Sequence, residues 1–511
     1  MIFRLCRHSL LGVWFALSAV TGARGAPPER PNILFIVSED NGPELGCYGD
    51  PYARTPHLDR LAAEGVRFTR AYVTQAGCSQ SRSSIMTGLY PHQNGQLGLA
   101  TWGFRLYRPD LPNLPRRLKS AGYRTGLIGK LHINPESAFP FDFWEIHNAN
   151  FARKGLADYA RHAEAFIRAS DQPFFLSVNY PDTHQPWTRQ VNGLPAQPLD
   201  GKDVKPMPYM GVDRPDLRAC VANYYNCMNR LDVLVGELLA VLQRSGKADH
   251  TLVVYFGDHG ADMLRGKRTS YEGGVRVPLL VRWPGQARAG QVRDDLVSTV
   301  DLMPTVLAAA GAAPVAGLAG CSLVPLLRAE KTEWRRYLFT EYHTHGGRNN
   351  YYPQRTVCTD RYKLIENLLP GEVNAGYEFT LHHLEADLGA AIAAAPTEVR
   401  AAYARMERPP RWELYDLQTD PFEFRNLADQ AAHASVLAEL QGALAGWRKE
   451  TADPLLNPDH LRRLTAEVSA GSKQLAREMS WEYPYYFFGQ EPPPKGSAEA
   501  EAQGRKKRKN K

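Results

Sequence analysis

The feature that most constrains the fold is a series of short, continuous apolar segments, each ending in charged or histidine-bearing residues. Residues 32–37 read NILFIV and residues 251–256 read TLVVYF, and segments 123–129 and 174–179 have a similar character. Runs of this length without alternation are typical of strands buried on both faces of a parallel sheet. Segments with helical spacing separate them, the longest from about 214 to 245. This order predicts an α/β fold, with a large, mostly parallel sheet flanked by helices.

The pattern changes after about residue 345. Residues 355–365 contain two short segments that predict a hairpin, and 412–417 and 432–449 predict a third strand and a closing helix. We therefore expect two domains, an α/β domain over 27–345 and a smaller α+β domain with an antiparallel sheet over 346–484.

The two ends of the chain predict segments outside these domains. Two arginines precede an apolar run over 10–20, and small residues follow up to residue 26, which is typical of a cleaved signal peptide over 1–26. About eleven apolar residues are too few for a membrane span, which needs roughly twenty. Without any Asn-x-Ser/Thr site, the chain is expected to be a bacterial export, periplasmic or secreted, with no transmembrane anchor. Residues 485–511 predict a disordered basic tail.

Charge and cysteine content exclude several classes of protein. The net charge is +7, and six of the positive charges lie in the last seven residues, so the body is close to neutral. A nearly neutral body gives no case for nucleic-acid binding. The seven cysteines include no C-x-x-C pair, which argues against a disulfide scaffold and against a zinc site built from cysteine clusters.

Charged residues follow four of the predicted strands. In open α/β sheets, ligands bind at the carboxyl ends of the strands, so residues at several such ends come together. Each residue taken alone fits a polar turn or a satisfied histidine, but the set predicts a site. Its members are Glu39 and Asp40, Lys130 and His132, His184, and Asp258 and His259.

A separate stretch, residues 77–88, places Cys78 among small residues and Arg82 four positions later. Small residues allow close approach to a ligand, and a helix beginning here would direct backbone N–H groups at an anion. Arg82 adds a fixed cationic fork beside the sulfur. The stretch predicts a nucleophile facing an anionic substrate, and the alternative from these residues alone is a buried structural cysteine.

Taken together, these motifs resemble the sulfatases of the alkaline phosphatase superfamily, over Pro31 to about Pro458. The likeness rests on Cys78-x-x-x-Arg82, Gly129-Lys130-x-His132, Asp258-His259-Gly260, and Gly266-Lys267 with the following Tyr271-Glu272-Gly273-Gly274-x-Arg276-Val277-Pro278. Within the family the likeness is greatest to the heparan N-sulfatase branch, which acts on N-sulfated glucosamine. The segments that carry this second likeness are 90–95, 140–143, 351–355, 411–416 and 447–454.

The resemblance implies a cofactor, a modification and a role for each site residue. It implies that a formylglycine-generating enzyme oxidises Cys78 to formylglycine, whose hydrated aldehyde is the nucleophile, and that Arg82 supports it. It implies a Ca²⁺ ion, held by Glu39, Asp40, Cys78, Asp258 and His259. It also implies sulfate binding by Lys130 and Lys267, and proton transfer by His132 and His184, of which His184 also contacts the substrate.

The sequence differs from the family pattern at three of these positions. Gln80 stands where the usual recognition pattern for formylglycine formation has proline or alanine. Glu39 and His259 stand where aspartate and asparagine are more common, a change of ligand that bears on the choice of metal.

The substrate implied by the resemblance is a heparan- or heparin-like sugar, from which sulfate is released at N-sulfoglucosamine or a related unit. His343 and Arg355 are expected to bind this anionic sugar, with an exposed hairpin surface as the alternative. Other readings of the whole chain are a sulfatase for another glycan, a phosphodiesterase or phosphonate hydrolase of the same superfamily, or an unmodified carbohydrate-binding relative. A homodimer is left open.

Overall fold

A nine-stranded sheet forms the centre of the larger part of the fold in the computed structural model, which describes residues 30–471 and 480–490. The strand order is β4-β3-β5-β1-β6-β7-β2-β8, with β9 paired to β2. Only β7 runs antiparallel to its neighbours, β6 and β2, so the predicted mostly parallel sheet is confirmed. The strands are β1 (Asn32–Ser38), β2 (Val66–Tyr72), β3 (Arg124–Gly129), β4 (Phe143–Glu145), β5 (Phe174–Asn179), β6 (Thr251–Gly257), β7 (Arg276–Arg282), β8 (Gln291–Arg293) and β9 (Val297–Ser298).

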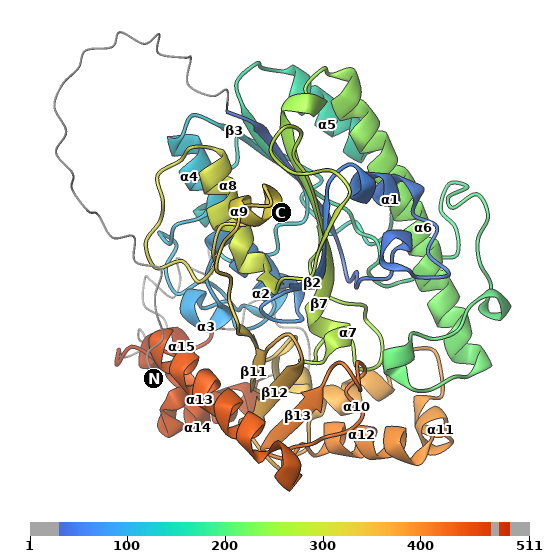
Figure 1. Ribbon diagram of the computed structural model, residues 1–511, viewed down its shortest axis with the longest axis vertical. Coiled ribbons are helices and arrows are strands. Elements are labelled where there is room, and N and C mark those ends of the chain that lie inside the picture. The colour runs from blue at the N-terminus through green and yellow to red at the C-terminus, as the bar shows by residue number, and fades with distance from the viewer. Residues whose placement is uncertain (1–29, 472–479, 491–511) are drawn as a thin grey trace. The chain divides into compact units, whose positions relative to one another are not determined.

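Helices cover both faces of this sheet (Figure 1). Strand β1 shows why its sequence is continuously apolar, because Leu34 and Ile36 pack into one core and Phe35 and Val37 into the other. On the first face lie α1 (Pro56–Ala63), α5 (Asp158–Arg168) and α6 (Pro215–Arg244). On the second lie α2 (Cys78–Thr87), α4 (Leu114–Ser120), α8 (Leu302–Ala309) and α9 (Val324–Leu327). The short α3 (Pro91–Asn94) and α7 (Glu272–Val275) complete this part of the chain.

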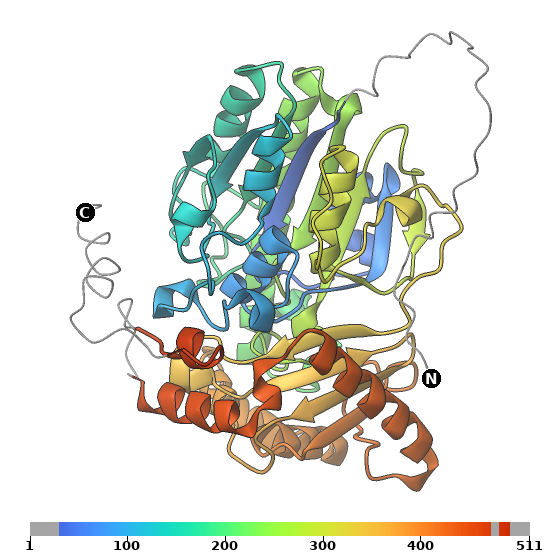
Figure 2. The same ribbon diagram turned by 90° about the vertical axis from the view of Figure 1, so that its left-hand side faces the viewer.

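A second sheet has four antiparallel strands in the order β10-β11-β12-β13 (Figure 2). The predicted hairpin is β11 with β12, and the predicted third strand is β13. The outer strand β10 begins before residue 345, and the backbone N–H of Glu341 at its end donates to the carbonyl oxygen of Thr74 at 2.8 Å. The chain from Pro31 onward is one compact unit, and the division into two domains stays a prediction. The bounds are β10 (Leu338–Tyr342), β11 (Gln354–Cys358), β12 (Tyr362–Asn367), β13 (Trp412–Asp416), α10 (Ala375–Leu381), α11 (Leu388–Ala393), α12 (Thr397–Glu407), α13 (Ala434–Glu450) and α14 (Pro458–Ala470).

The start of the predicted disordered tail at residue 485 is wrong, because residues up to 490 are ordered. Helix α15 (Tyr483–Tyr486) packs its aromatic side chains into a cluster with Phe104 and Tyr351. The hydroxyl of Tyr483 donates to the carbonyl of Gly95 at 2.6 Å, and Phe487 is also buried. These aromatic residues supply the apolar surface that a disordered tail lacks.

Three expectations concern the ends of the chain or the membrane. The signal peptide over 1–26 and the rest of the tail, 491–511, lie outside the described residues. Export to the periplasm or the medium therefore stays a prediction. Among residues 30–471 and 480–490, no helix has both the length and the apolar character that a membrane span requires.

Candidate active site

The ends of four neighbouring strands position most of the predicted site residues. Strands β3, β5, β1 and β6 lie side by side and run parallel, so their carboxyl ends open at one edge of the sheet. Predicted site residues follow each of them, Lys130 after β3, His184 after β5, Glu39 and Asp40 after β1, and Asp258 after β6. The parallel pairing brings together residues that are more than two hundred positions apart.

The nucleophile candidate Cys78 is the first residue of α2, whose side chains are all buried. Its Sγ lies 3.3 Å from Nε2 of His259, which follows β6. Cys78 itself is only 2% exposed. The sulfur therefore lies at the start of a helix and beside residues at the sheet edge, as the sequence predicts.

Arg82, one turn further along α2, ties the helix to the ends of four strands, β1, β3, β5 and β6. Its guanidinium forms an ion pair with Glu39 and donates through Nε to Oδ2 of Asp258 at 3.1 Å. A second nitrogen donates to Oδ1 of Asn179 at 2.7 Å and to the carbonyl of Lys130 at 3.1 Å. Such charge-assisted bonds in a buried place fix the orientation of the helix that carries Cys78.

Two lysines add positive charge next to Cys78. Nζ of Lys130 donates to Oε2 of Glu39 at 2.8 Å, and Nζ of Lys267 lies 2.8 and 3.0 Å from the two carboxylate oxygens of Asp40. Burial disfavours both ammonium groups, but the surrounding anions raise the pKa of Lys130 and of Lys267 above the usual range. Both side chains therefore stay charged and available to an anionic ligand.

The carboxylates of Glu39, Asp40 and Asp258 converge on Cys78, each no more than 1% exposed. Ligand atoms of Glu39, Asp40, Cys78 and His184 lie within 4.8 Å of one another, as do those of Cys78, Asp258 and His259. Buried carboxylates need positive charge beside them, and three oxygen-bearing groups in one place are the donors that Ca²⁺ prefers. The donor set therefore fits a hard divalent cation.

The pKa values show how the buried charges depend on one another. Burial opposes ionisation of Glu39, yet Lys130 and Arg82 hold its pKa well below the usual range. Burial also raises the pKa of Asp258, and neighbouring acids add to this. Although burial disfavours the imidazolium of His259, Asp258 and Asp40 raise its pKa to about 9. A cation bound through Nε2 of His259 must therefore displace a proton.

Burial disfavours the charged form of the two other histidines at the site. Burial lowers the pKa of His184 to about 4, and Nδ1 donates to the carbonyl of Gln185 at 2.6 Å, so Nε2 faces Asp40 at 3.9 Å. Burial and the charge of Lys130 lower the pKa of His132 well below its usual value. Neither ring nitrogen of His132 has a hydrogen-bond partner in the part of the chain that the structure describes. An orphaned imidazole beside a cluster of charges is suited to a ligand.

Two predicted substrate-binding residues, His343 and Arg355, have partners outside the group of residues around Cys78. His343 is fully buried, with Nε2 3.4 Å from Oε1 of Glu341, and Arg355 is fully buried in an ion pair with Asp453. Within residues 30–471 and 480–490 neither forms a hydrogen bond or ion pair with Cys78 or with the carboxylates around it. The structure gives both side chains structural partners, and substrate binding stays a prediction for them.

Sequence reasoning missed three polar residues of the site. Asn179 holds Arg82, and its only signal is a polar residue at the end of an apolar strand. Asp262 lies 3.9 Å from Nζ of Lys267 and accepts from Nε2 of His383 at 2.9 Å. His383 follows α10 and is far from the other site residues in sequence, so no local pattern indicates it.

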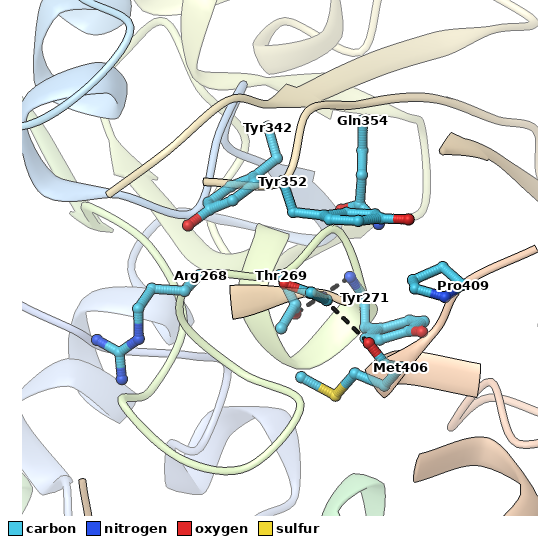
Figure 3. Close-up of a pocket in the computed structure, with 9 residues that line it drawn as sticks. Arg268, Thr269, Tyr271, Tyr342, Tyr352, Gln354, Met406 and Pro409 are labelled. Atoms are coloured by element: carbon cyan, nitrogen blue, oxygen red, sulfur yellow. Dashed lines mark hydrogen bonds between the residues drawn. The ribbon is translucent and has the colours of Figure 1, made fainter. Parts of the chain in front are cut away.

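A small cavity lies beyond Lys267, between the segment that follows it and the second sheet (Figure 3). None of the site residues named above lines it, so it is separate from the group around Cys78. The residues that line it are Arg268, Thr269, Tyr271, Tyr342, Tyr352, Gln354, Asn374, Met406 and Pro409.

Comparison with known proteins defines the class. The sulfatase family model matches residues 31–312, more than half of the chain. The chain therefore belongs to the sulfatase family and is an enzyme, a hydrolase of the sulfatase class, as the sequence motifs predict. Within the family, the model described as "N-sulphoglucosamine sulphohydrolase, C-terminal" matches residues 257–387.

Two individual relatives are similar to this chain over most of its length. Human N-sulphoglucosamine sulphohydrolase is 34% identical over 481 residues, covering 86% of this chain and 93% of the human protein. An ulvan-active sulfatase of Formosa agariphila is 30% identical over 452 residues, covering 84% and 82%. By name, the first acts on N-sulphoglucosamine and the second on ulvan, and each matches more than four fifths of this chain.

Solved structures share the fold at lower identity. One is a complex of a protein with its substrate D-glucosamine-2-N,6-O-disulfate, with a TM-score of 0.63 and 21% identity over 83% of this chain and 99% of that one. Another is the phosphonate monoester hydrolase of Agrobacterium radiobacter, with a TM-score of 0.62 and 22% identity over 83% and 96%. The predicted alkaline phosphatase-like fold is thereby confirmed.

Proposed function

We propose that the protein releases sulfate from N-sulfoglucosamine or a related sulfated sugar of heparan type. The observation that carries the choice of substrate is a likeness that extends over both parts of the chain. The human N-sulphoglucosamine sulphohydrolase matches 86% of the chain, and the C-terminal model of that enzyme matches residues 257–387. This second region contains Lys267 at the site and β10 to β12 of the second sheet.

Membership of the sulfatase family and the donor set support the proposed nucleophile and metal. Cys78 is the residue oxidised to formylglycine, which supplies a hydroxyl group of a hydrated aldehyde as the nucleophile. Glu39, Asp40, Asp258 and His259 would hold a Ca²⁺ ion, which would supply positive charge at the bound sulfate. Three buried carboxylates support this assignment, since calcium prefers oxygen ligands.

The chain's own residues bind the anion and move the proton. Lys130 and Lys267 hold the sulfate oxygens, whose charge grows on the way to the transition state. Arg82 holds α2 in place. In the overall reaction, water is consumed, the N–S bond breaks, sulfur leaves as sulfate and the sugar nitrogen gains a proton. His184 delivers this proton through Nε2, and an anionic sulfamate beside the imidazole favours its protonated form.

The test combines mass spectrometry with product analysis. Protein purified from its native host is digested, and the peptide containing residue 78 is examined for formylglycine, while sulfate release from N-sulfoglucosamine is measured with and without calcium. We expect formylglycine, sulfate release and its loss on chelation, and no activity in Cys78→Ala. Unmodified cysteine together with no sulfate release would overturn the proposal and favour a carbohydrate-binding relative. A clear preference for a phosphoester would instead favour a phosphodiesterase of the same superfamily.

A further inference from the structure

The loop after β4 places an aromatic ring against the proton donor of the site. Phe151 stacks face to face on the imidazole of His184, with ring centroids 3.9 Å apart and planes at 10°. Nζ of Lys130 lies 5.3 Å from the centroid of the same ring. Phe151 is partly exposed, and the reaction described above does not use it. One side chain thus contacts two residues that handle the sulfate group and the leaving group.

A buried arginine two residues later holds both stacked residues. The guanidinium of Arg153 donates to the carbonyl oxygens of Phe151 and His184, and its Nε donates to Oδ1 of Asp182 at 3.1 Å. Arg153 has φ of 51°, a conformation that residues other than glycine adopt only where their surroundings enforce it. The loop is therefore fixed to the end of β5 by one side chain rather than lying freely over it.

The anchor of Arg153 is itself part of a rigid network. Asp182 is fully buried and also pairs with Arg230 on α6, at 2.8 Å through each carboxylate oxygen. Its backbone carbonyl accepts from the N–H of Glu39 at 3.0 Å. The stacked pair is thus connected to the turn that carries Glu39 and to the longest helix of the chain. Such supporting contacts are what hold a catalytic group in its productive geometry.

Two contacts set the orientation of the imidazole of His184. The bond from Nδ1 to the carbonyl of Gln185 fixes which nitrogen faces the site, and the ring of Phe151 blocks rotation out of the stacked plane. We propose that Phe151 is a positioning residue, which keeps Nε2 of His184 directed at the leaving group while Arg153 holds Phe151 in place. This inference rests on the proposed function.

The leaving group decides how much the positioning matters. A sugar amine or alkoxide is a poor leaving group and departs only with a proton, whereas a nitrophenolate departs without one. A misplacement of about 1 Å costs on the order of 100-fold in rate. Loss of the Phe151 ring should therefore slow the cleavage of N-sulfoglucosamine and spare 4-nitrophenyl sulfate.

The test compares Phe151→Leu and Phe151→Tyr with the parent on both substrates, in preparations whose formylglycine content is equal by mass spectrometry. For N-sulfoglucosamine, we expect Phe151→Leu to lower kcat by about 10- to 100-fold with KM within about twofold. For 4-nitrophenyl sulfate, kcat should stay within about threefold. Phe151→Tyr keeps the ring face and should retain parent rates. Phe488→Leu, at an aromatic residue 58% exposed in the C-terminal segment, is the matched control.

The possible failures are distinguishable. Equal losses on both substrates, a loss confined to KM, or unchanged rates in Phe151→Leu would overturn this inference while the parent remained a sulfatase. If Phe151→Leu melts at the same temperature as the parent, misfolding is excluded as the cause of a rate loss. If it melts lower, the same kinetic comparison is made with Phe151→Met. A parent protein inactive on both substrates would overturn the proposed function and this inference with it.

Discussion

Replacing Arg355 with methionine removes one of two cations from a buried ion-pair network between β11 and the segment after α13. The guanidinium of Arg355 donates to the two carboxylate oxygens of Asp453 at 2.9 and 2.8 Å and to the carbonyl of Gln354 at 2.8 Å. It also lies 3.9 Å from Oε2 of Glu341. In the variant, Asp453 keeps the bond from Nε of Arg448, at 2.7 Å, and the bond from the backbone N–H of Leu455, at 3.0 Å.

The magnitude follows from burial. Removing one partner of a buried ion pair costs about 3–5 kcal/mol, and the remaining bonds from Arg448 and Leu455 to Asp453 place this variant near 3 kcal/mol. An unfolding entropy of about 2.1 cal/mol/K per residue, over the roughly 450 residues that the structure describes, amounts to about 1 kcal/mol/K. We therefore expect Arg355→Met to lower the melting temperature by about 3 °C, with the KM for the sugar unchanged.

The pH dependence has a definite sign. Burial alone would raise the pKa of Asp453, but Arg355 holds it below the usual range. The pair therefore stabilises the fold above the unfolded pKa of about 3.9, and this contribution is lost as the pH falls through the lower folded pKa. The difference in melting temperature between parent and Arg355→Met should be full from about pH 5 upward and shrink below about pH 4.

Thermal unfolding and steady-state kinetics on the same preparations decide between a structural role and substrate binding. Arg189→Met is the matched control, because Arg189 and Asp200 form a similar two-bond pair on the surface, worth about 0–1 kcal/mol. Asp453→Asn and the double variant complete a cycle that isolates the pair. An unchanged melting temperature with a KM raised tenfold would refute the structural role and support binding of the sugar by Arg355.

Three further predictions concern charge, positioning and the C-terminal segment. Burial raises the pKa of the Glu44 carboxyl to about 7, so the parent loses stability as the pH rises from about 4.3 to 7. The melting temperature of Glu44→Gln should exceed that of the parent by an amount that grows across this pH window, and a constant difference in melting temperature would contradict the prediction. Asn179→Leu removes an acceptor of Arg82 and should lower kcat about 10- to 100-fold with an unchanged KM, measured on N-sulfoglucosamine; unchanged kcat would exclude a positioning role. A chain ending at residue 479 loses four buried aromatic residues between 480 and 490, and its melting temperature should fall by about 5 °C or more. An unchanged melting temperature would show that these four aromatic residues add no stability.

The sequence predicts the sheet and most of the site for one physical reason. Strands buried on both faces are continuously apolar, so Glu39 and Asp258 stand out as the first charges after β1 and β6. Parallel pairing then brings such strand ends together without any further information. The motif spacing around Cys78 adds the helix that completes the site.

Features formed by distant segments could not be predicted in the same way. Phe151 lies in an irregular loop, and nothing in its surrounding sequence indicates that its ring meets His184. The aromatic residues after 480 look like a short segment before a basic tail until their partners, such as Phe104, are known. Arg355 stands near a family motif, but its partner Asp453 lies 98 positions later, so the sequence could not indicate their ion pair, and sugar binding by Arg355 stays a prediction.

Gln80 is the position where the sequence differs most from the family pattern, and the fold accounts for it. Its side chain is fully buried on α2, and Nε2 donates to the carbonyl oxygens of Thr344 at 2.6 Å and Leu97 at 3.3 Å. The amide thus ties the helix of Cys78 to the segment after β10, a contact that neither proline nor alanine can make. If Cys78 is oxidised as proposed, the oxidising enzyme must act before Thr344 packs against α2, because Cys78 is 2% exposed in the fold. Under that proposal, the maturing enzyme meets Gln80 in the unfolded chain, whereas the two hydrogen bonds of Gln80 form only in the folded one.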